Sequence, residues 1–212
     1  MTKGINVSTS LVRQLTENGV GKRNLLKSYV TSAKRNKLHT AQWYREMHDI
    51  CAEIADFYKL PLNLVVGIMA VVSPQQNVTS NVNACVKAIG AYRNGAHCEN
   101  TSIGGYPANK RKAFAMMESG EVFPHLSGDK VVPFYQNIMH YNSPEYVTID
   151  RHAIHLFLYG YNGKCSGALR IDSVSYNLIA SVYNDVAAML GYLPSEFQAL
   201  TWTIQASANQ YI

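Results

Sequence analysis

The sequence predicts an all-α protein, on the strength of three observations. Of its 212 residues, 47% are hydrophobic and only 16% are charged, a balance that suits a buried core rather than a disordered chain. Apolar residues recur at helical spacing along most of the chain, whereas runs that alternate in the manner of a strand are few and short. We find no internal repeat and no alternation of strands with helices, so an α/β architecture is not expected.

Helical periodicity predicts eight helices after residue 40, and local signals place several of their ends. Thr40 is expected to be the N-cap of the first, Pro61 to open the second and Asn109 to cap the fourth. Gly191 is expected to stop the long seventh helix. The expected helices cover residues 41–58, 62–72, 78–92, 110–117, 131–139, 151–159, 173–190 and 194–205.

Two of these helices carry further expectations. The helix over residues 62–72 is apolar nearly all round, so we expect it to be central. Pro133 is compatible with the helix over residues 131–139 only because it falls in the first turn. The glycine-rich, polar residues 97–107 and 160–167 are expected to be loops.

The net charge of +5, from 19 basic and 14 acidic residues, is an N-terminal feature. Nine Lys and Arg residues lie from Lys3 to Arg45, against the single acid Glu17. We therefore expect a basic helical arm over residues 1–39, followed by a helical domain over residues 40–212. Such a run is commonly a solvated face, but a basic helix can also follow the phosphates of a nucleic acid.

Neither a membrane nor an oxidising compartment is expected. The chain has no run of about 18 apolar residues and no signal peptide behind its first residues. The four cysteines are spread along the chain without a CxxC pattern, so we interpret them as reduced thiols of a cytoplasmic protein. They are Cys51, Cys85, Cys98 and Cys165.

Three segments carry the candidate chemistry. The first is Ser-Pro-Gln-Gln-Asn at residues 73–77, which follows an apolar helix and precedes another helix. The second is Leu-Ser-Gly-Asp-Lys at residues 126–130, a glycine turn that leads into a helix. The third is Val-Thr-Ile-Asp-Arg-His at residues 147–152, an apolar tripeptide that ends on Asp150 at a helix start.

In this order, and with the gap of about twenty residues from Lys130 to Asp150, the chain resembles the helix-hairpin-helix DNA glycosylases, the endonuclease III-like superfamily. The resemblance covers about residues 62–159, and the terminal helices more loosely. It implies a fold of two helical halves with a cleft between them, in which core motifs over residues 60–160 are covered by terminal helices that pack back. The likeness is to compact, phage-type members of the fold.

The resemblance also implies roles for individual residues. Asp150 matches the catalytic aspartate of the family, and Lys130 matches the lysine that bifunctional members use as a nucleophile. Gln75 matches a glutamine that enters the DNA helix beside the vacated base. The turn before Lys130 matches the hairpin whose backbone amides hold a DNA phosphate. The DNA contacts expected on this basis are Gln75, Gln76, Asn77, Ser127, Gly128, Asp129, Arg151 and His152.

Three departures from the family pattern bear on these expectations. The hairpin has one glycine, Gly128, instead of two that flank a variable residue. The cysteine cluster that holds an iron–sulfur centre in many relatives is missing, so no cofactor and no metal are expected. Arg151 stands where relatives have threonine, which keeps His152 in register but changes the pocket.

The chemistry of such a site follows from the reaction. Cleavage of a glycosidic bond passes through a cationic sugar, which a fixed carboxylate such as Asp150 stabilises in a water-poor cleft. A neutral amine such as Lys130 can attack the sugar carbon, form a Schiff base and nick the strand by β-elimination. A base inside a duplex must first be flipped out, and the gap then needs a plug such as Gln75 or Gln76.

Structural interpretations of the same residues stay open. Asp150 can be an N-cap, which is compatible with a role in a cleft, and Asn77 can cap the helix that follows it. Lys130 can be a surface lysine near a phosphate. His152 and His155 lie three residues apart on one helix face, but without an identifiable third ligand they favour pocket histidines over a metal site.

The sequence therefore predicts a monomeric DNA glycosylase that acts on double-stranded DNA with a modified or damaged base, with or without lyase activity. It is expected in the cytoplasm, either associated with a nucleoid or in a phage-infected host. Two alternatives are a transferase that modifies thymine side groups on the same scaffold, and a non-catalytic module that only binds DNA.

Overall fold

The computed structural model describes residues 4–74, 76–161 and 169–208. Within these residues the protein is mostly helical, with ten α-helices, two short 3-10 helices and two strands of two residues each. The predicted all-α class is therefore confirmed. The contacts divide the chain into two compact units, which we call unit 1 (Met1–Tyr44 with Tyr141–Ile212) and unit 2 (Arg45–His140).

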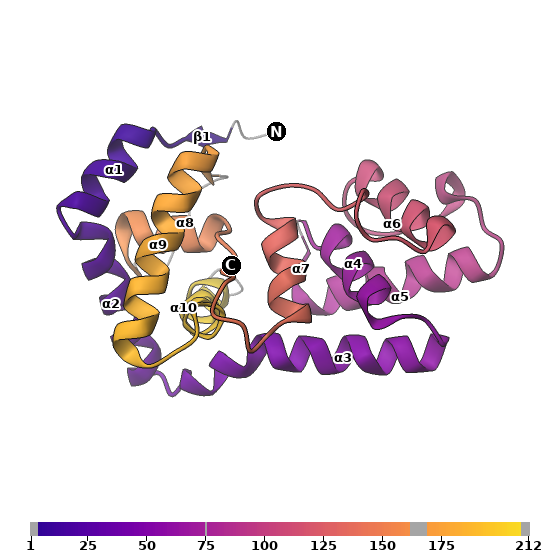
Figure 1. The fold of residues 1–212 in the computed structure, drawn as a ribbon, viewed down its shortest axis with the longest axis horizontal. Coiled ribbons are helices and arrows are strands. Elements are labelled where there is room, and N and C mark those ends of the chain that lie inside the picture. Colours follow the sequence, from indigo (N-terminus) through magenta and orange to yellow (C-terminus); the bar gives the residue numbers. More distant parts are fainter. Residues whose placement is uncertain (1–3, 75, 162–168, 209–212) are drawn as a thin grey trace. The chain divides into compact units, whose positions relative to one another are not determined.

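Unit 1 joins elements from the two ends of the chain (Figure 1). In chain order its elements are β1 (Ile5–Asn6), α1 (Thr9–Glu17), α2 (Val20–Lys34), the 3-10 helix η1 (Leu38–Gln42), α8 (Arg151–Tyr159), β2 (Leu169–Arg170), α9 (Ser173–Leu190) and α10 (Pro194–Ala208). The helix α2 packs against α8, α9 and α10, and α1 packs against α9. Residues 1–39, which the sequence set apart as a basic arm, thus contribute two packed helices to this unit.

The two terminal segments meet in one hydrophobic core and one strand pair. Leu25, Phe157, Tyr183 and Phe197 come from four helices, and less than 2% of each side chain is exposed. The strands β1 and β2 pair in parallel, with Ile5 opposite Leu169. This core and this pairing hold the start of the chain against its last third.

The closest helix contact in unit 1 lies between α2 and α8. A Cβ atom added at Gly21 would lie 2.1 Å from Cε2 of the Phe157 ring, so only glycine lets the two helices approach this far. Beside it, the side-chain amide of Asn24 donates to the carbonyl oxygens of Phe157 and Leu158, both at 3.0 Å. These bonds satisfy carbonyl groups at the C-terminal end of α8, which have no partner inside the helix.

Unit 2 is organised around one buried helix (Figure 1). Its elements are α3 (Trp43–Tyr58, which starts in unit 1), α4 (Leu62–Val72), α5 (Val78–Arg93), the 3-10 helix η2 (Cys98–Asn100), α6 (Pro107–Ser119) and α7 (Val131–Met139). All residues of α4 from Leu64 onward are buried, and α4 packs against α5, α6 and α7. The expectation that this apolar helix is central is confirmed.

Most predicted helix boundaries are confirmed, because their signals are local. The helices α4, α7, α8 and α9 have the expected bounds, Pro133 falls in the first turn of α7, and Gly191 ends α9 with a φ of 75°. Two expected caps are wrong. Thr40 lies inside η1 and donates to the carbonyl of Lys37, so it does not cap α3.

The second corrected cap is Asn109, which lies inside α6 because this helix already starts at Pro107. The fixed φ of proline suits the first helical position, and its missing N–H costs nothing there. The last helix, α10, continues to Ala208, three residues beyond its expected end. Of the loop expected at residues 160–167, residues 162–167 lie outside the described part of the chain.

Candidate functional site

Asp150 occupies the N-terminal end of α8 and is only 9% exposed. Its Oδ1 atom accepts hydrogen bonds from the backbone N–H groups of His152, at 3.0 Å, and Ala153, at 2.9 Å. This is an N-cap, as the structural interpretation of the sequence expected, and such a cap contributes about 1 kcal/mol. Among the described residues none donates a hydrogen bond to Oδ2, so the cap uses only one of the two carboxylate oxygens.

The extended segment before Asp150 is held by a side chain from another helix. The hydroxyl of Tyr176, on α9, donates to the carbonyl of Val147 at 3.0 Å and accepts from the N–H of Ile149 at 3.1 Å. Thr148 between them is buried. One hydroxyl thus uses both its donor and its acceptor capacity to fix the backbone that carries the carboxylate.

Half-buried aromatic rings lie beside the start of α8. The ring of His152 lies edge-on to Trp202 of α10, with 6.3 Å between centroids, and Trp202 lies against Trp43 at 5.5 Å. The Nε of Arg151 donates to Nε2 of His152 at 3.3 Å, which places the proton of a neutral His152 ring on Nδ1. Trp202 therefore lies between His152 and Trp43, the other tryptophan of the chain.

A buried tyrosine from α9 lies within electrostatic reach of Asp150. Burial raises the pKa of the Tyr183 hydroxyl well above its ordinary value, a hydrogen bond with Thr201 lowers it in part, and the Asp150 carboxylate raises it further. The hydroxyl donates to the carbonyl of Ala153 at 3.4 Å. Tyr183 therefore stays protonated and supports the first turn of α8 as a donor.

The face of α10 toward this region is polar although it is buried. Gln198, Thr201 and Gln205 are each less than 5% exposed and follow one another at helical spacing. The Oε1 of Gln198 accepts from the Tyr44 hydroxyl at 2.9 Å. In contrast, neither amide atom of Gln205 has a hydrogen-bond partner within the described residues. A buried amide without partners lowers the stability of the folded state, so Gln205 differs from an ordinary core residue.

The predicted hairpin turn lies in unit 2, at the start of α7. Gly128 has a φ of 107°, and an added Cβ there would meet nothing within 4 Å, so the turn is open to solvent. The side-chain Nζ of Lys112 donates to Oγ of Ser127 at 2.7 Å. Lys130 is half-buried at the N-cap of α7, while Asp129 is exposed. A glycine turn before a helix is therefore present where the sequence predicted it.

The turn over residues 73–77 also lies in unit 2. Asn77 caps α5, with its Oδ1 accepting from the N–H of Ser80 at 2.8 Å. The side chain of Gln76 lies so close to Gly104 that an added Cβ would be 2.4 Å from its Nε2. Gln75 lies outside the described residues. The cap expected at Asn77 is confirmed, and Gln76 packs on a glycine of a neighbouring loop.

The expected site residues thus fall into two groups. Asp150, Arg151 and His152 belong to unit 1, whereas Gln76, Asn77, Ser127, Gly128, Asp129 and Lys130 belong to unit 2. Within the described residues, no group of three His, Cys, Asp or Glu side chains is arranged to hold a metal ion. His155 is 2% exposed and its ring lies 5.1 Å from that of Tyr159.

Sequence reasoning missed the residues that support Asp150 from a distance. Tyr176, Tyr183 and Trp202 come from α9 and α10, and none has a local sequence pattern that names its partner. The only available signal was general: tyrosine and tryptophan combine a large ring with a polar group that needs a partner when buried.

In the comparison with known proteins, a family model matches residues 9–210 of the chain. The chain belongs to this family. It is DUF7178, described as a family of unknown function. The match to DUF7178 spans both units, from α1 to the C-terminal end of α10.

No curated protein and no solved structure matches the chain. In the described part of the chain, no single helix is both long and apolar enough to cross a membrane, and only the bent pair Leu38–Tyr58 and Leu62–Val72 meets those criteria when its two helices are combined.

Proposed function

We propose that this protein is a DNA glycosylase of the helix-hairpin-helix type, which releases a modified or damaged base from duplex DNA with Asp150 as its catalytic carboxylate. The observation that carries the proposal is the state of Asp150. One of its oxygens is bound by two backbone N–H groups, the other accepts nothing from the described residues, and the side chain is 9% exposed.

The chemistry of base release needs such a group. As the glycosidic bond breaks, positive charge develops on the sugar, and a carboxylate that is already oriented stabilises this charge without reorganising. The N-cap bonds and the Tyr176 bonds fix Asp150 and the segment before it. The rings of His152, Trp202 and Trp43 form a cluster at the first turn of α8, and their apolar surface lowers the water content there.

Lys130 is the proposed nucleophile of a second, lyase step. It is half-buried at the start of α7, directly after the glycine turn, and its side chain forms no hydrogen bond or ion pair with the described residues. An amine in this position attacks C1′ of the sugar, forms a Schiff base and leads to strand cleavage by β-elimination. The Gly128 turn supports binding of the backbone phosphate, because such a turn presents N–H groups to an anion.

The glycosylase step is tested with duplexes that each carry one deaminated, oxidised or alkylated base. Free base is measured by mass spectrometry, and abasic sites are measured by alkaline cleavage. Asp150→Asn keeps an N-cap residue, so the variant should fold as the wild type does and lose at least 100-fold in rate, an estimate for loss of one electrostatic group. The matched control is Asp172→Asn, which alters an exposed N-cap aspartate of α9 and should leave base release intact.

The same samples discriminate between the alternatives. Nucleoside mass spectrometry that finds altered thymidine and no free base identifies a transferase and rules out excision. Equal DNA binding by wild type and Asp150→Asn, without any product, identifies a binding module. Release of free base at equal rates by both proteins also contradicts the proposal, because Asp150 is then not catalytic.

Borohydride trapping tests the lyase step separately. A Schiff base between Lys130 and an abasic duplex is reduced to a stable adduct, which Lys130→Gln should abolish. Lys112→Gln is the matched control, because Lys112 lies at the same turn through its bond to Ser127. Trapping that survives in Lys130→Gln and disappears in Lys112→Gln reassigns the nucleophile.

A further inference from the structure

The excess positive charge of the protein lies entirely in unit 1. Unit 1 contains eleven Lys and Arg residues against six Asp and Glu residues, whereas unit 2 contains eight of each. In unit 1 the basic residues are concentrated in the first 44 residues, where Glu17 is the single acid. The helix α2 contributes four of them and contains no acid.

Three of the four basic residues share one face of α2. Arg23, Lys27 and Lys34 are spaced by four and seven residues, which places them within a narrow sector of the helix. All three are exposed, and none forms an ion pair with any described residue. We call them the α2 stripe. The opposite side of α2 carries its buried residues, Leu25 and Ser28 among them, so the stripe faces solvent.

Arg23 at one end of the stripe is held in place. Its Nη1 atom donates to the carbonyl of Asn18 at 3.1 Å, in the short connection between α1 and α2. From Arg23 to Lys34 the stripe extends over eleven residue steps, or about 16 Å of helix axis. Phosphates of one strand of a duplex rise about 3.4 Å each, so this length faces about five of them.

The α2 stripe is separate from Asp150. Asn24, on α2, binds the carbonyls at the C-terminal end of α8, whereas Asp150 lies at the N-terminal end of the same helix. The axis of α8 between these ends measures about 13 Å. A ligand on the stripe therefore does not need to occupy the Asp150 site.

We propose that the α2 stripe binds the sugar-phosphate backbone of duplex DNA, independently of sequence, as a second contact outside the catalytic site. The proposal rests on the proposed function for the identity of the polyanion. Cations that lack acidic partners attract a line of phosphates and release the condensed counterions, and this release makes the affinity fall as salt increases. The stripe reads no base, so it contributes to binding and not to recognition of the damaged base.

The test is the salt dependence of binding to a fluorescein-labelled duplex without modified bases. The variant with Arg23→Gln, Lys27→Gln and Lys34→Gln should reduce the slope of log affinity against log salt by about 3, since each contact contributes about 0.9. A fourfold rise in salt then weakens the wild type about 40-fold more than this variant. Thermal melting confirms that the variant is folded.

A control of equal charge distinguishes the stripe from net charge. The variant with Lys59→Gln, Lys87→Gln and Arg93→Gln removes three exposed cations from unit 2 and should keep the wild-type slope. Equal loss of slope in both triple variants, or none in the stripe variant, overturns the proposal. So does wild-type protein that ignores duplex DNA but sediments with phosphatidylcholine–phosphatidylserine vesicles.

Catalysis is measured on the same variants to separate this proposal from the proposed function. With enzyme in excess over a modified duplex, the stripe variant should release base at the wild-type rate, because only the affinity has changed. A rate as low as that of Asp150→Asn means that the stripe is part of the site and overturns its separate role. If the wild type binds duplexes with the expected slope yet releases no base, the proposed function fails and the stripe stands.

Discussion

The hydroxyl of Tyr176 accepts a hydrogen bond from the backbone N–H of Ile149, the residue directly before Asp150, at 3.1 Å. The same hydroxyl donates to the carbonyl of Val147. A side chain of α9 thereby orders the extended segment that leads into α8, and couples the packing of α9 to the position of the candidate catalytic carboxylate.

Tyr176→Phe removes this hydroxyl and keeps the ring. We expect the free energy of unfolding to fall by about 1–3 kcal/mol, since two backbone groups lose their partner. Under the proposed function, kcat should fall while KM stays unchanged, because Asp150 moves and the DNA contacts do not. Urea denaturation and steady-state base release measure the two effects.

The control for this prediction is Tyr159→Phe, which removes the hydroxyl of a tyrosine that is 55% exposed at the end of α8. It should change neither the stability nor kcat. A Tyr176→Phe protein that is destabilised but has an unchanged kcat shows that the hydroxyl serves the fold alone.

Gly21→Ala tests the close approach of α2 and α8. The new Cβ would lie 2.1 Å from the Phe157 ring, which must shift, so we expect a loss of about 1–3 kcal/mol in unfolding free energy. Gly90→Ala in α5 is the matched control. Its Cβ would find only the Tyr58 hydroxyl at 3.7 Å, so the higher helix propensity of alanine should make it neutral or stabilising.

Thermal melting compares the two alanine variants, and a double variant with Gly21→Ala and Phe157→Leu should recover part of the loss. If Gly21→Ala melts at or above the wild-type temperature, the approach of the two helices is not as tight as the structure indicates.

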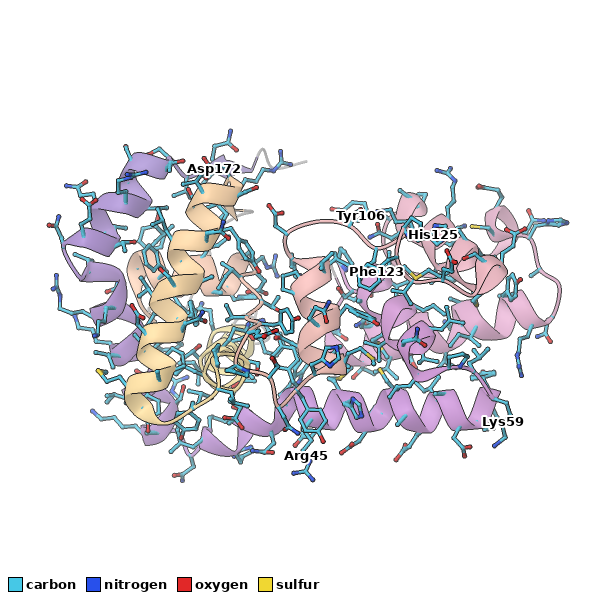
Figure 2. The ribbon with its side chains drawn as sticks, in the orientation of Figure 1. Arg45, Lys59, Tyr106, Phe123, His125 and Asp172 are labelled. Carbon is cyan, nitrogen blue, oxygen red and sulfur yellow. The ribbon has the colours of Figure 1, made fainter. Side chains whose placement is uncertain are left out.

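Asp172 makes stability depend on pH. It lies at the N-terminal end of α9 (Figure 2), where hydrogen bonds from the Thr9 hydroxyl and the Ser175 N–H lower its pKa from 3.8 to about 2. The pKa is lower in the folded state, so its stabilisation is present above pH 4 and is lost as the pH falls toward 2.

Asp172→Asn should therefore have a lower melting temperature than the wild type at neutral pH. This difference in melting temperature, here called the margin, should shrink between about pH 4 and pH 2. Asp185→Asn changes an exposed carboxylate of the same helix and should show no such margin. A margin for Asp172→Asn that is constant down to pH 2 contradicts the role of its carboxylate.

Burial makes two thiols of unit 2 unreactive. It raises the pKa of Cys51 from 9.0 to about 12, and raises that of Cys85 well above its ordinary value. The thiolate is the reactive form, so both should resist iodoacetamide at pH 8 in the native protein, while the half-buried Cys98 is labelled. Peptide mass mapping before and after denaturation in guanidinium measures each cysteine, and rapid native labelling of Cys51 would show that unit 2 opens readily.

The features that could be predicted from the sequence depend on neighbours within a few residues. The cap at Asp150 joins groups two and three residues apart, and Pro133 marks the first turn of α7. The prediction that Thr40 is an N-cap also depended on near neighbours, but it is wrong, because the chain forms a 3-10 turn at Leu38–Gln42 before α3 begins. Local signals indicate where a helix can start, and tertiary packing selects among the possible starts.

The support of Asp150 could not be predicted, because it depends on distant parts of the chain. Tyr176 lies 27 residues from Ile149, and Asn24 lies 133 residues from Phe157. Nothing in the residues around Gly21 indicates that an aromatic ring from α8 will fill the space of a missing Cβ. Likewise, the positive charge of α2 can be counted in the sequence, but only the burial pattern of the helix shows that these residues lie on one exposed face.

The composition of unit 1 from the two ends of the chain has a consequence for folding during synthesis. Unit 2 is one continuous segment that leaves the ribosome whole, so it can collapse around α4 while later residues are still being added. The helices α1 and α2 are synthesised first but can pack only after α8, α9 and α10 have been made. Closing the long loop between these segments costs chain entropy, which the Gly21–Phe157 contact and its neighbours then offset. Nascent chains arrested before α8 should accordingly protect residues 45–140 from proteases and leave α2 accessible.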